Sequence, residues 1–166
     1  ALLSYEHLFE PTSPEGNGAE PQYSACLVFS KETDLSDLKK AVDDAGKAKW
    51  GEKYDSLKES DSLRLPFRTD RLKEKGYQNG SVYINVRSKQ QPGIASKYAG
   101  PDGKPQLITD HAEVYSGCKV RATLSVFAYE KAGNRGVSFG LNNVQKLDDG
   151  ERLDGRLKAE DDFGAI

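Results

Sequence analysis

Methionine is absent from the 166 residues, histidine and cysteine occur twice each, and tryptophan occurs once. No apolar run approaches the ~18 residues that a membrane-spanning helix needs, and no signal-peptide pattern opens the chain. Cys26 and Cys118 both lie inside apolar strand patterns, so we expect buried free thiols rather than a disulfide scaffold. These absences predict a protein of the reducing cytoplasm, with a sequence that begins inside or just after the natural start.

Residues suited to catalysis are equally sparse. His111-Ala112-Glu113, with Cys118 downstream, has the His-x-Glu spacing of zinc deaminases, but the Pro-Cys-x-x-Cys pair that completes such a site is missing. Asp110 and Glu113 could hold Mg²⁺ in a nuclease, although two acids beside a loop are more typical of a solvated surface. No nucleophile elbow and no phosphate-binding Gly-x-x-x-x-Gly-Lys loop occurs. The sequence therefore predicts no enzyme, no metal and no cofactor.

The charge that is present is sorted by position. Residues 64–135 hold 13 Lys/Arg against 6 Asp/Glu, whereas residues 1–63 hold 7 against 13 and residues 136–166 hold 4 against 7. The net charge of -2 thus hides a basic middle between two acidic ends. The basic middle also contains seven of the fifteen aromatic residues. Cations that follow a phosphate backbone, mixed with rings on which bases stack, are typical of single-stranded nucleic-acid binding without sequence preference.

Hydrophobic periodicity predicts a mainly β protein with one or two helices. Strands are expected over residues 22–29, 81–89, 118–129 and 137–141, and a helix is expected from Thr33 or Asp34 to about residue 49. Residues 90–110 are rich in Pro and Gly and predict a long loop. The count favours an OB-fold-like, five-stranded barrel over residues 1–147, followed by an acidic, mobile tail over residues 148–166. It leaves the oligomeric state open.

Two of the expected strands have one apolar face and one face of basic and aromatic residues, and these faces predict the binding site. Phosphates are expected on the cations of the strands and of the long loop, namely Arg87, Lys89, Lys97, Lys119 and Arg121. Bases are expected to stack on Tyr83, Tyr98, Phe127 and Tyr129. The alternative for Tyr83 and Phe127 is that both rings pack under the helix as core residues.

Several motifs together resemble a known family. They are Ser4-Tyr5-x-x-Leu8-Phe9-x-Pro11, Tyr23-x-Ala25, Tyr115-Ser116-Gly117-Cys118, Gly140-Leu141-Asn142-Asn143-Val144-Gln145-Lys146 and the closing Asp161-Asp162-Phe163. The chain resembles, over nearly its whole length, the single-stranded DNA-binding proteins of tailed-phage replication modules. That resemblance implies an OB fold, sequence-independent binding of single-stranded DNA in phage replication and recombination, and a place in the cytoplasm of the infected host.

The resemblance also implies a role for the acidic C-terminus. Asp161, Asp162 and Phe163 would recruit replication or recombination proteins, and the tail would compete with DNA for the basic face. The final Gly164-Ala165-Ile166 departs from family tails that stop at Phe. Two other hypotheses remain open from the sequence: a phage structural or assembly protein with a β-sandwich fold, and a metal-dependent nuclease that uses Asp110 and Glu113.

Overall fold

The structure is a computed structural model, and it describes residues 1–13, 20–70, 77 and 80–153. The strands are β1 (Leu2–Thr12), β2 (Gln22–Phe29), β3 (Val82–Ser88), β4 (Gly93–Ala99), β5 (Pro105–Leu107), β6 (Lys119–Lys131) and β7 (Asn134–Asp148). The helical elements are α1 (Ser36–Trp50), α2 (Lys53–Glu59) and the 3-10 turn η2 (His111–Glu113). No helix within these ranges is both long and apolar enough to cross a membrane.

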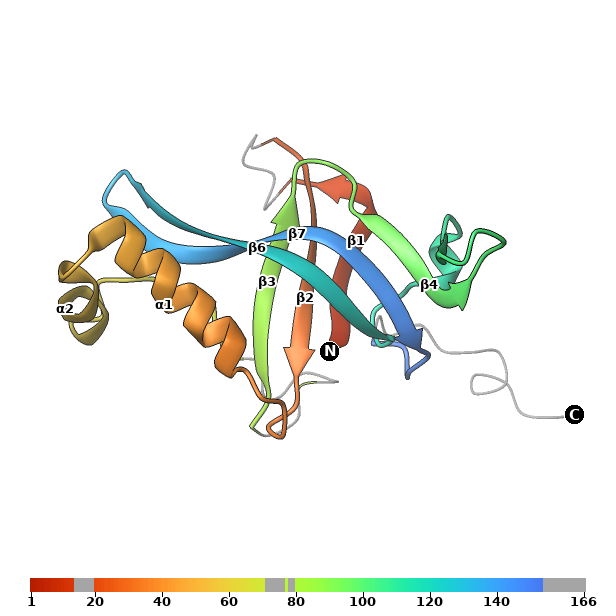
Figure 1. Ribbon diagram of the computed structural model, residues 1–166, viewed down its shortest axis with the longest axis horizontal. Helices are drawn as coiled ribbons and strands as arrows, with labels where there is room; N and C mark the ends of the chain where they lie inside the picture. The colour runs from red at the N-terminus through yellow and green to blue at the C-terminus, as the bar shows by residue number, and fades with distance from the viewer. Residues whose placement is uncertain (14–19, 71–76, 78–79, 154–166) are drawn as a thin grey trace, which may run out of the picture.

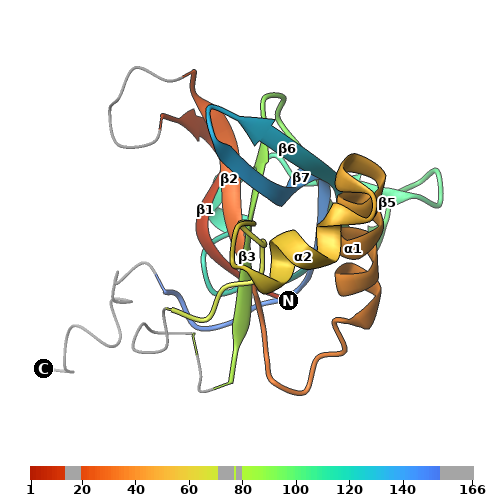
Figure 2. The same cartoon turned by 90° about the vertical axis from the view of Figure 1, so that its left-hand side faces the viewer.

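Five strands close into a ring. The sheet runs β3-β2-β1-β6-β7-β4-β5, and a further parallel pairing of β3 with β7 joins Val86 to Phe139 and Arg87 to Gly140. The ring therefore contains β1, β2, β3, β6 and β7, which is the strand count of an OB barrel. Figure 1 shows the long β6–β7 hairpin crossing in front of β2 and β3, with α1 and α2 on the left, and Figure 2 shows the two helices from that side. The predicted OB-like fold is confirmed.

Alternation along β6 and β7 builds the core. Val137, Phe139 and Leu141 on β7 are at most 4% exposed and face the interior with Val120 of β6, as a period of two requires. At Asn142 a register shift adds a residue to β7, and beyond this bulge β7 pairs with β4 instead of β3. The run Gly140–Lys146 thus marks the point where β7 passes from one neighbour to the other.

Helix α1 covers the inner face of the β6–β7 hairpin. The N-cap residue is Leu35, without a side-chain capping bond, and not the predicted Thr33 or Asp34. Asp34 accepts a hydrogen bond from the backbone N–H of Ser36 (2.9 Å), and this bond lowers the pKa of the Asp34 carboxyl. Val42 lies in the main core, and Trp50 packs against it while its indole N–H donates to Glu130 (3.4 Å). Because α1 lies on the inner face of the hairpin, the outer face of β6 and β7 remains open.

The structure differs from the sequence-based prediction in three segments. Residues 2–12 form β1, to which no strand was assigned, and the predicted loop over residues 90–110 contains the β4–β5 hairpin. Residues 64–68 fill the gap between β3 and β7, because Arg64 bridges to Gly136 and Arg68 bridges to Tyr83. The Pro and Gly residues that predicted a loop lie at the ends of β4 and β5, where they do not interrupt strand pairing.

Cys26 and Cys118 are buried thiols that form no disulfide, as predicted, and burial raises the pKa of the Cys118 thiol. The chain also stays against the barrel after β7, since the Leu153 N–H donates to the Ser116 carbonyl (2.9 Å). A Cβ at Gly117 would overlap the Glu151 carbonyl, so the close approach requires glycine. The predicted start of the tail at residue 148 thus falls in a segment that contacts the barrel, and residues 154–166 lie outside the described ones.

Candidate nucleic-acid interface

Small residues line the outer face of β7, and they leave a shallow depression on the protein surface there. Gly136, Ser138 and Gly140 lie on the face of β7 opposite to Val137, Phe139 and Leu141, and Gly136 is buried there beneath Tyr129 and Arg64. A Cβ at Gly136 would lie 2.6 Å from the Tyr129 hydroxyl oxygen and 2.6 Å from the Arg64 carbonyl oxygen. Glycine at this position therefore lets the Tyr129 ring lie against β7. The result is a shallow floor with taller side chains on both sides.

A groove of about 440 Å³ follows from this arrangement, and it brings together four of the predicted site residues. Its lining residues are Gln22, Arg87, Ser88, Lys89, Phe127, Tyr129, Ser138 and Phe139. The aromatic wall comes from β6 and the basic wall from the end of β3. The groove opens on the barrel face made by β3, β6 and β7.

Phe127 offers an open ring in this groove. Its side chain is 49% exposed although α1 packs on the same hairpin, because Phe127 pairs with Ser138 on the outer face. Tyr129 is half-buried next to it. The alternative that Phe127 is a core residue under the helix is therefore wrong.

The cations of the basic wall have no acidic partner among the described residues. Among the residues that the structure describes, neither Arg87 nor Lys89 forms an ion pair, and both are exposed. Other basic side chains are neutralised locally: Arg135 Nε lies 2.6 Å from a carboxylate oxygen of Glu130. A cation with no carboxylate beside it has the most favourable electrostatic interaction with a phosphate.

Arg121 and Lys119 continue the basic surface along the outer face of β6. Arg121 Nε donates to the Gln145 side-chain oxygen (2.6 Å), which leaves the other guanidinium donors for a ligand. Lys119 is exposed at the start of the strand and pairs across to Asp148. Lys119 and Tyr129 are ten residue steps apart along β6, and ten steps of about 3.3 Å each give a distance of about 33 Å.

Tyr83 is a core residue, so its predicted role in stacking is corrected. The side chain is 2% exposed and belongs to a second apolar cluster with Cys26, Val28 and Tyr77. The Tyr77 ring meets it edge-on at 5.4 Å, and the Tyr83 hydroxyl donates to the Asp70 carboxylate (2.6 Å). Tyr83 does point to the outer side of β3, but Tyr77 covers it there and leaves no ring face for a base.

Lys97 and Tyr98 lie on β4, away from the groove described above. They line a second groove of about 460 Å³ whose wall includes four carboxylates, Asp110, Glu113, Asp148 and Asp149. Asp110 accepts a hydrogen bond from the backbone N–H of Ala112 (2.9 Å) and so begins the turn η2. Across the described ranges, no three His, Cys, Asp or Glu side chains are grouped so that they could hold a metal ion.

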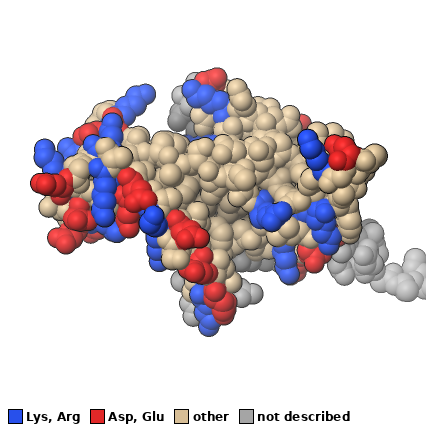
Figure 3. Space-filling view, viewed as in Figure 1, with Lys and Arg blue, Asp and Glu red and all other residues tan. Residues whose placement is uncertain are grey.

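Arg64 is a candidate that the sequence did not reveal. Its backbone pairs with Gly136, so its exposed side chain extends on the same outer face as Tyr129. The residue lies in an isolated bridge rather than a strand, and no periodicity marks it. Figure 3 shows acidic and basic side chains mixed over α1 and α2, while the upper middle of the molecule in this view is largely uncharged.

A family model described as the ssDNA-binding protein of Enterobacter phage Enc34 matches residues 1–166. The chain belongs to this family. It is also 31% identical over 163 residues to a protein called p50 of Acyrthosiphon pisum secondary endosymbiont phage 1, and the match covers 92% of this chain and 83% of p50.

Solved structures of phage proteins share the fold. The single-stranded DNA-binding protein of bacteriophage Enc34 in complex with ssDNA aligns with a TM-score of 0.68 at 24% identity, covering 92% of this chain and 85% of that one. The single-stranded DNA-binding protein gp2.5 of bacteriophage T7 aligns with a TM-score of 0.64 at 11% identity, covering 96% of this chain and 94% of that one. Likeness at this level of identity establishes the fold.

Proposed function

We propose that the chain binds single-stranded DNA without sequence preference, through the groove between β3 and the β6–β7 hairpin. The observation that carries this proposal is the meeting of Arg87 and Lys89 with Phe127 and Tyr129 around one groove. Bases stack on the two rings, and the phosphates between them lie against the two cations. Stacking reads only the face of a base, which every base has, so no sequence is selected.

Beyond the groove, the strand continues along the outer face of β6 toward Arg121 and Lys119, and Arg64 contacts it beside Tyr129. Lys97 and Tyr98 are not part of this path, because the carboxylates around them repel phosphate. Helix α1 packs on the inner face of the hairpin, which leaves the outer side for the strand. Membership of the phage family supports the assignment, as does the same fold in a relative solved with ssDNA.

The protein acts, on this proposal, as a non-catalytic coat for single strands exposed during phage replication and recombination in the cytoplasm of the infected bacterium. A fluorescence titration with oligo(dT) and with a duplex of equal length, at several salt concentrations, tests this. We expect tighter binding of the single strand and a steep loss of affinity with salt, since bound counterions are released. Equal affinity for both, or a flat salt response, would favour an assembly protein instead.

Removal of single charges along β6 should change the salt dependence. Lys119→Ala and Arg121→Ala should each lower the slope of log affinity against log salt by about 0.7 in magnitude, the value for one phosphate contact on a single strand. Stability should hold, because the core neighbour Val120 is untouched. Lys40→Ala is the matched control, since Lys40 lies on α1 in an exposed pair with Asp44. If both β6 variants kept the wild-type slope of log affinity against log salt, the DNA strand would not pass over Lys119 and Arg121.

The C-terminal tail should compete with DNA. Asp161, Asp162 and Phe163 lie outside the described residues, and the argument rests on charge: residues 148–166 hold 7 Asp/Glu against 3 Lys/Arg. Deleting residues 159–166 should tighten oligo(dT) binding, most at low salt, where charges are least screened. On this hypothesis, DNA frees the tail for replication or recombination proteins. Unchanged or weaker binding at low salt would contradict competition by the tail.

A further inference from the structure

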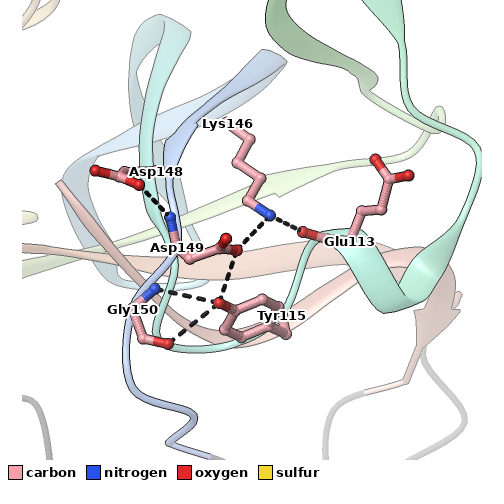
Figure 4. Close-up of polar contacts among 6 residues, drawn as sticks. All are labelled: Glu113, Tyr115, Lys146, Asp148, Asp149 and Gly150. Carbon is pink, nitrogen blue, oxygen red and sulfur yellow. Dashed lines mark hydrogen bonds and ion pairs between the residues drawn. The ribbon is translucent and has the colours of Figure 1, made fainter.

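The groove beneath the β4–β5 hairpin has a fixed wall at the end of β7. Figure 4 shows the contacts that hold it: Lys146 Nζ lies 2.7 Å from an Asp149 carboxylate oxygen and donates to the Glu113 carbonyl (2.6 Å). The Tyr115 hydroxyl donates to the same Asp149 oxygen (2.9 Å) and accepts from the Gly150 N–H (3.1 Å). This network joins β7 to the turn η2, so a ligand would meet a groove that is already formed.

Large apolar side chains are exposed around this groove. Five such side chains are exposed within the described ranges, and three of them line it: Leu107 (76%), Tyr98 (66%) and Leu147 (37%). They come from three different strands and gather at one place, unlike the scattered single apolar residues that are normal on a surface. The concentration indicates a surface that another molecule covers.

The charge around the groove selects a basic occupant. Lys146 is neutralised by Asp149, whereas Asp110, Glu113 and Asp148 form no ion pair with any described Lys or Arg. Lys97 lines the groove with these three carboxylates, and its ammonium group lies 5.3 Å from the centre of the Tyr98 ring. Lys119 is the cross-strand neighbour of Asp148 on β6. These carboxylates repel a phosphate backbone and attract Lys or Arg side chains.

An exposed strand edge completes the surface. β5 ends the strand order of the sheet, so in the described part of the chain no strand pairs with its outer edge. β5 has three residues and its Pro105 has no N–H, so an extended peptide can pair there only over a short stretch, with the backbone groups of Gln106 and Leu107. Alternate side chains of the added strand would then face the apolar residues and the carboxylates in turn.

We propose that this groove docks an extended segment of a partner protein that carries Lys or Arg beside apolar side chains. The DNA groove and this partner groove are separate but connected. Arg121 bonds to Gln145, and the Gln145 side-chain N–H donates to the Ser96 carbonyl (3.0 Å) in the wall of the partner groove. Because the two grooves are lined by different residues, the protein can bind a partner while DNA stays in its own groove.

Amide chemical shifts of the full chain test the proposal, with and without saturating oligo(dT). The probe is a synthetic peptide of alternating Lys and Val, and alternating Glu and Val is its control. We expect the Lys/Val peptide, and not the Glu/Val peptide, to shift the amides of Tyr98, Leu107 and Leu147. This result should be the same with and without oligo(dT). Because the result without oligo(dT) does not depend on DNA binding, failure here is distinct from failure of the proposed function.

Variants separate the possible occupants. Leu107→Ser should weaken peptide binding roughly tenfold, since burial of a leucine side chain is lost. Glu113→Gln with Asp148→Asn should weaken it several-fold, whereas Asp44→Asn with Glu59→Gln, the same charge change on the helices, should not. The proposal is overturned if millimolar basic peptide shifts no amide in this groove or if oligo(dT) occupies it. Self-association of the chain that Leu107→Ser abolishes would also overturn it.

Discussion

Tyr83→Ala should lower the free energy of unfolding by about 3 to 5 kcal/mol, the range for removing a large buried ring. The side chain is 2% exposed and packs edge-on against Tyr77, so the truncation leaves a cavity in the second apolar cluster. Urea unfolding measures the loss. At a temperature where the variant is still folded, its affinity for oligo(dT) should stay close to that of the wild type, because Tyr83 does not line the DNA groove.

Tyr83→Phe is the control that keeps the ring and removes the hydroxyl. The hydroxyl donates to Asp70 and is the main cause that lowers the pKa of that carboxyl, so the Asp70 pKa should rise in the variant. A lowered folded-state pKa stabilises the fold above the unfolded-state pKa, and this contribution is lost as pH falls through the folded-state value. The two proteins should therefore differ in stability at neutral pH and converge in acid. If Tyr83→Ala kept full stability but lost affinity for DNA, the ring would belong to the DNA site and not to the core.

The case of Tyr83 shows how far strand alternation can be taken. The period of two correctly placed Ile84 and Val86 in the core and Arg87 on the other face. The same period placed Tyr83 outward, which is also its direction in the structure. What covers the ring is Tyr77, a residue from outside the strand, and a local pattern carries no information about such a contact.

The groove itself depends on pairing that is distant in sequence. Arg87 and Phe127 meet because β3 pairs in parallel with β7 at Gly140, while β7 pairs with β6 at Ser138. The composition of the two faces predicted four of the residues that line the groove, but only the barrel closure brings the two faces to one place. No sign of the further candidate Arg64 is present in the sequence for the same reason, since its position is set by a single bridge to Gly136.

Phe127→Ala should have the largest effect on binding. Loss of one stacked base costs about 1 to 3 kcal/mol, which corresponds to about 5- to 150-fold in affinity for oligo(dT). The ring is 49% exposed on the open face of β6, so the melting temperature should change little. Phe127→Tyr should restore binding because it keeps the ring, whereas Phe127→Leu should not, although it keeps most of the apolar volume.

A double-mutant cycle with Arg87 then tests whether the two walls of the groove hold one strand. Phe127 and Arg87 both line the groove, and they face each other across the narrow outer surface of Ser138 and Gly140. If the same nucleotide stacks on the ring and pairs with the guanidinium, the effects of Phe127→Ala and Arg87→Ala should be non-additive. The salt slope should fall only in variants that lack Arg87, because Phe127 releases no counterion. Additive losses with equal changes in slope would mean that the two residues bind separate parts of the strand, and the groove would not be the site where base and phosphate are held together.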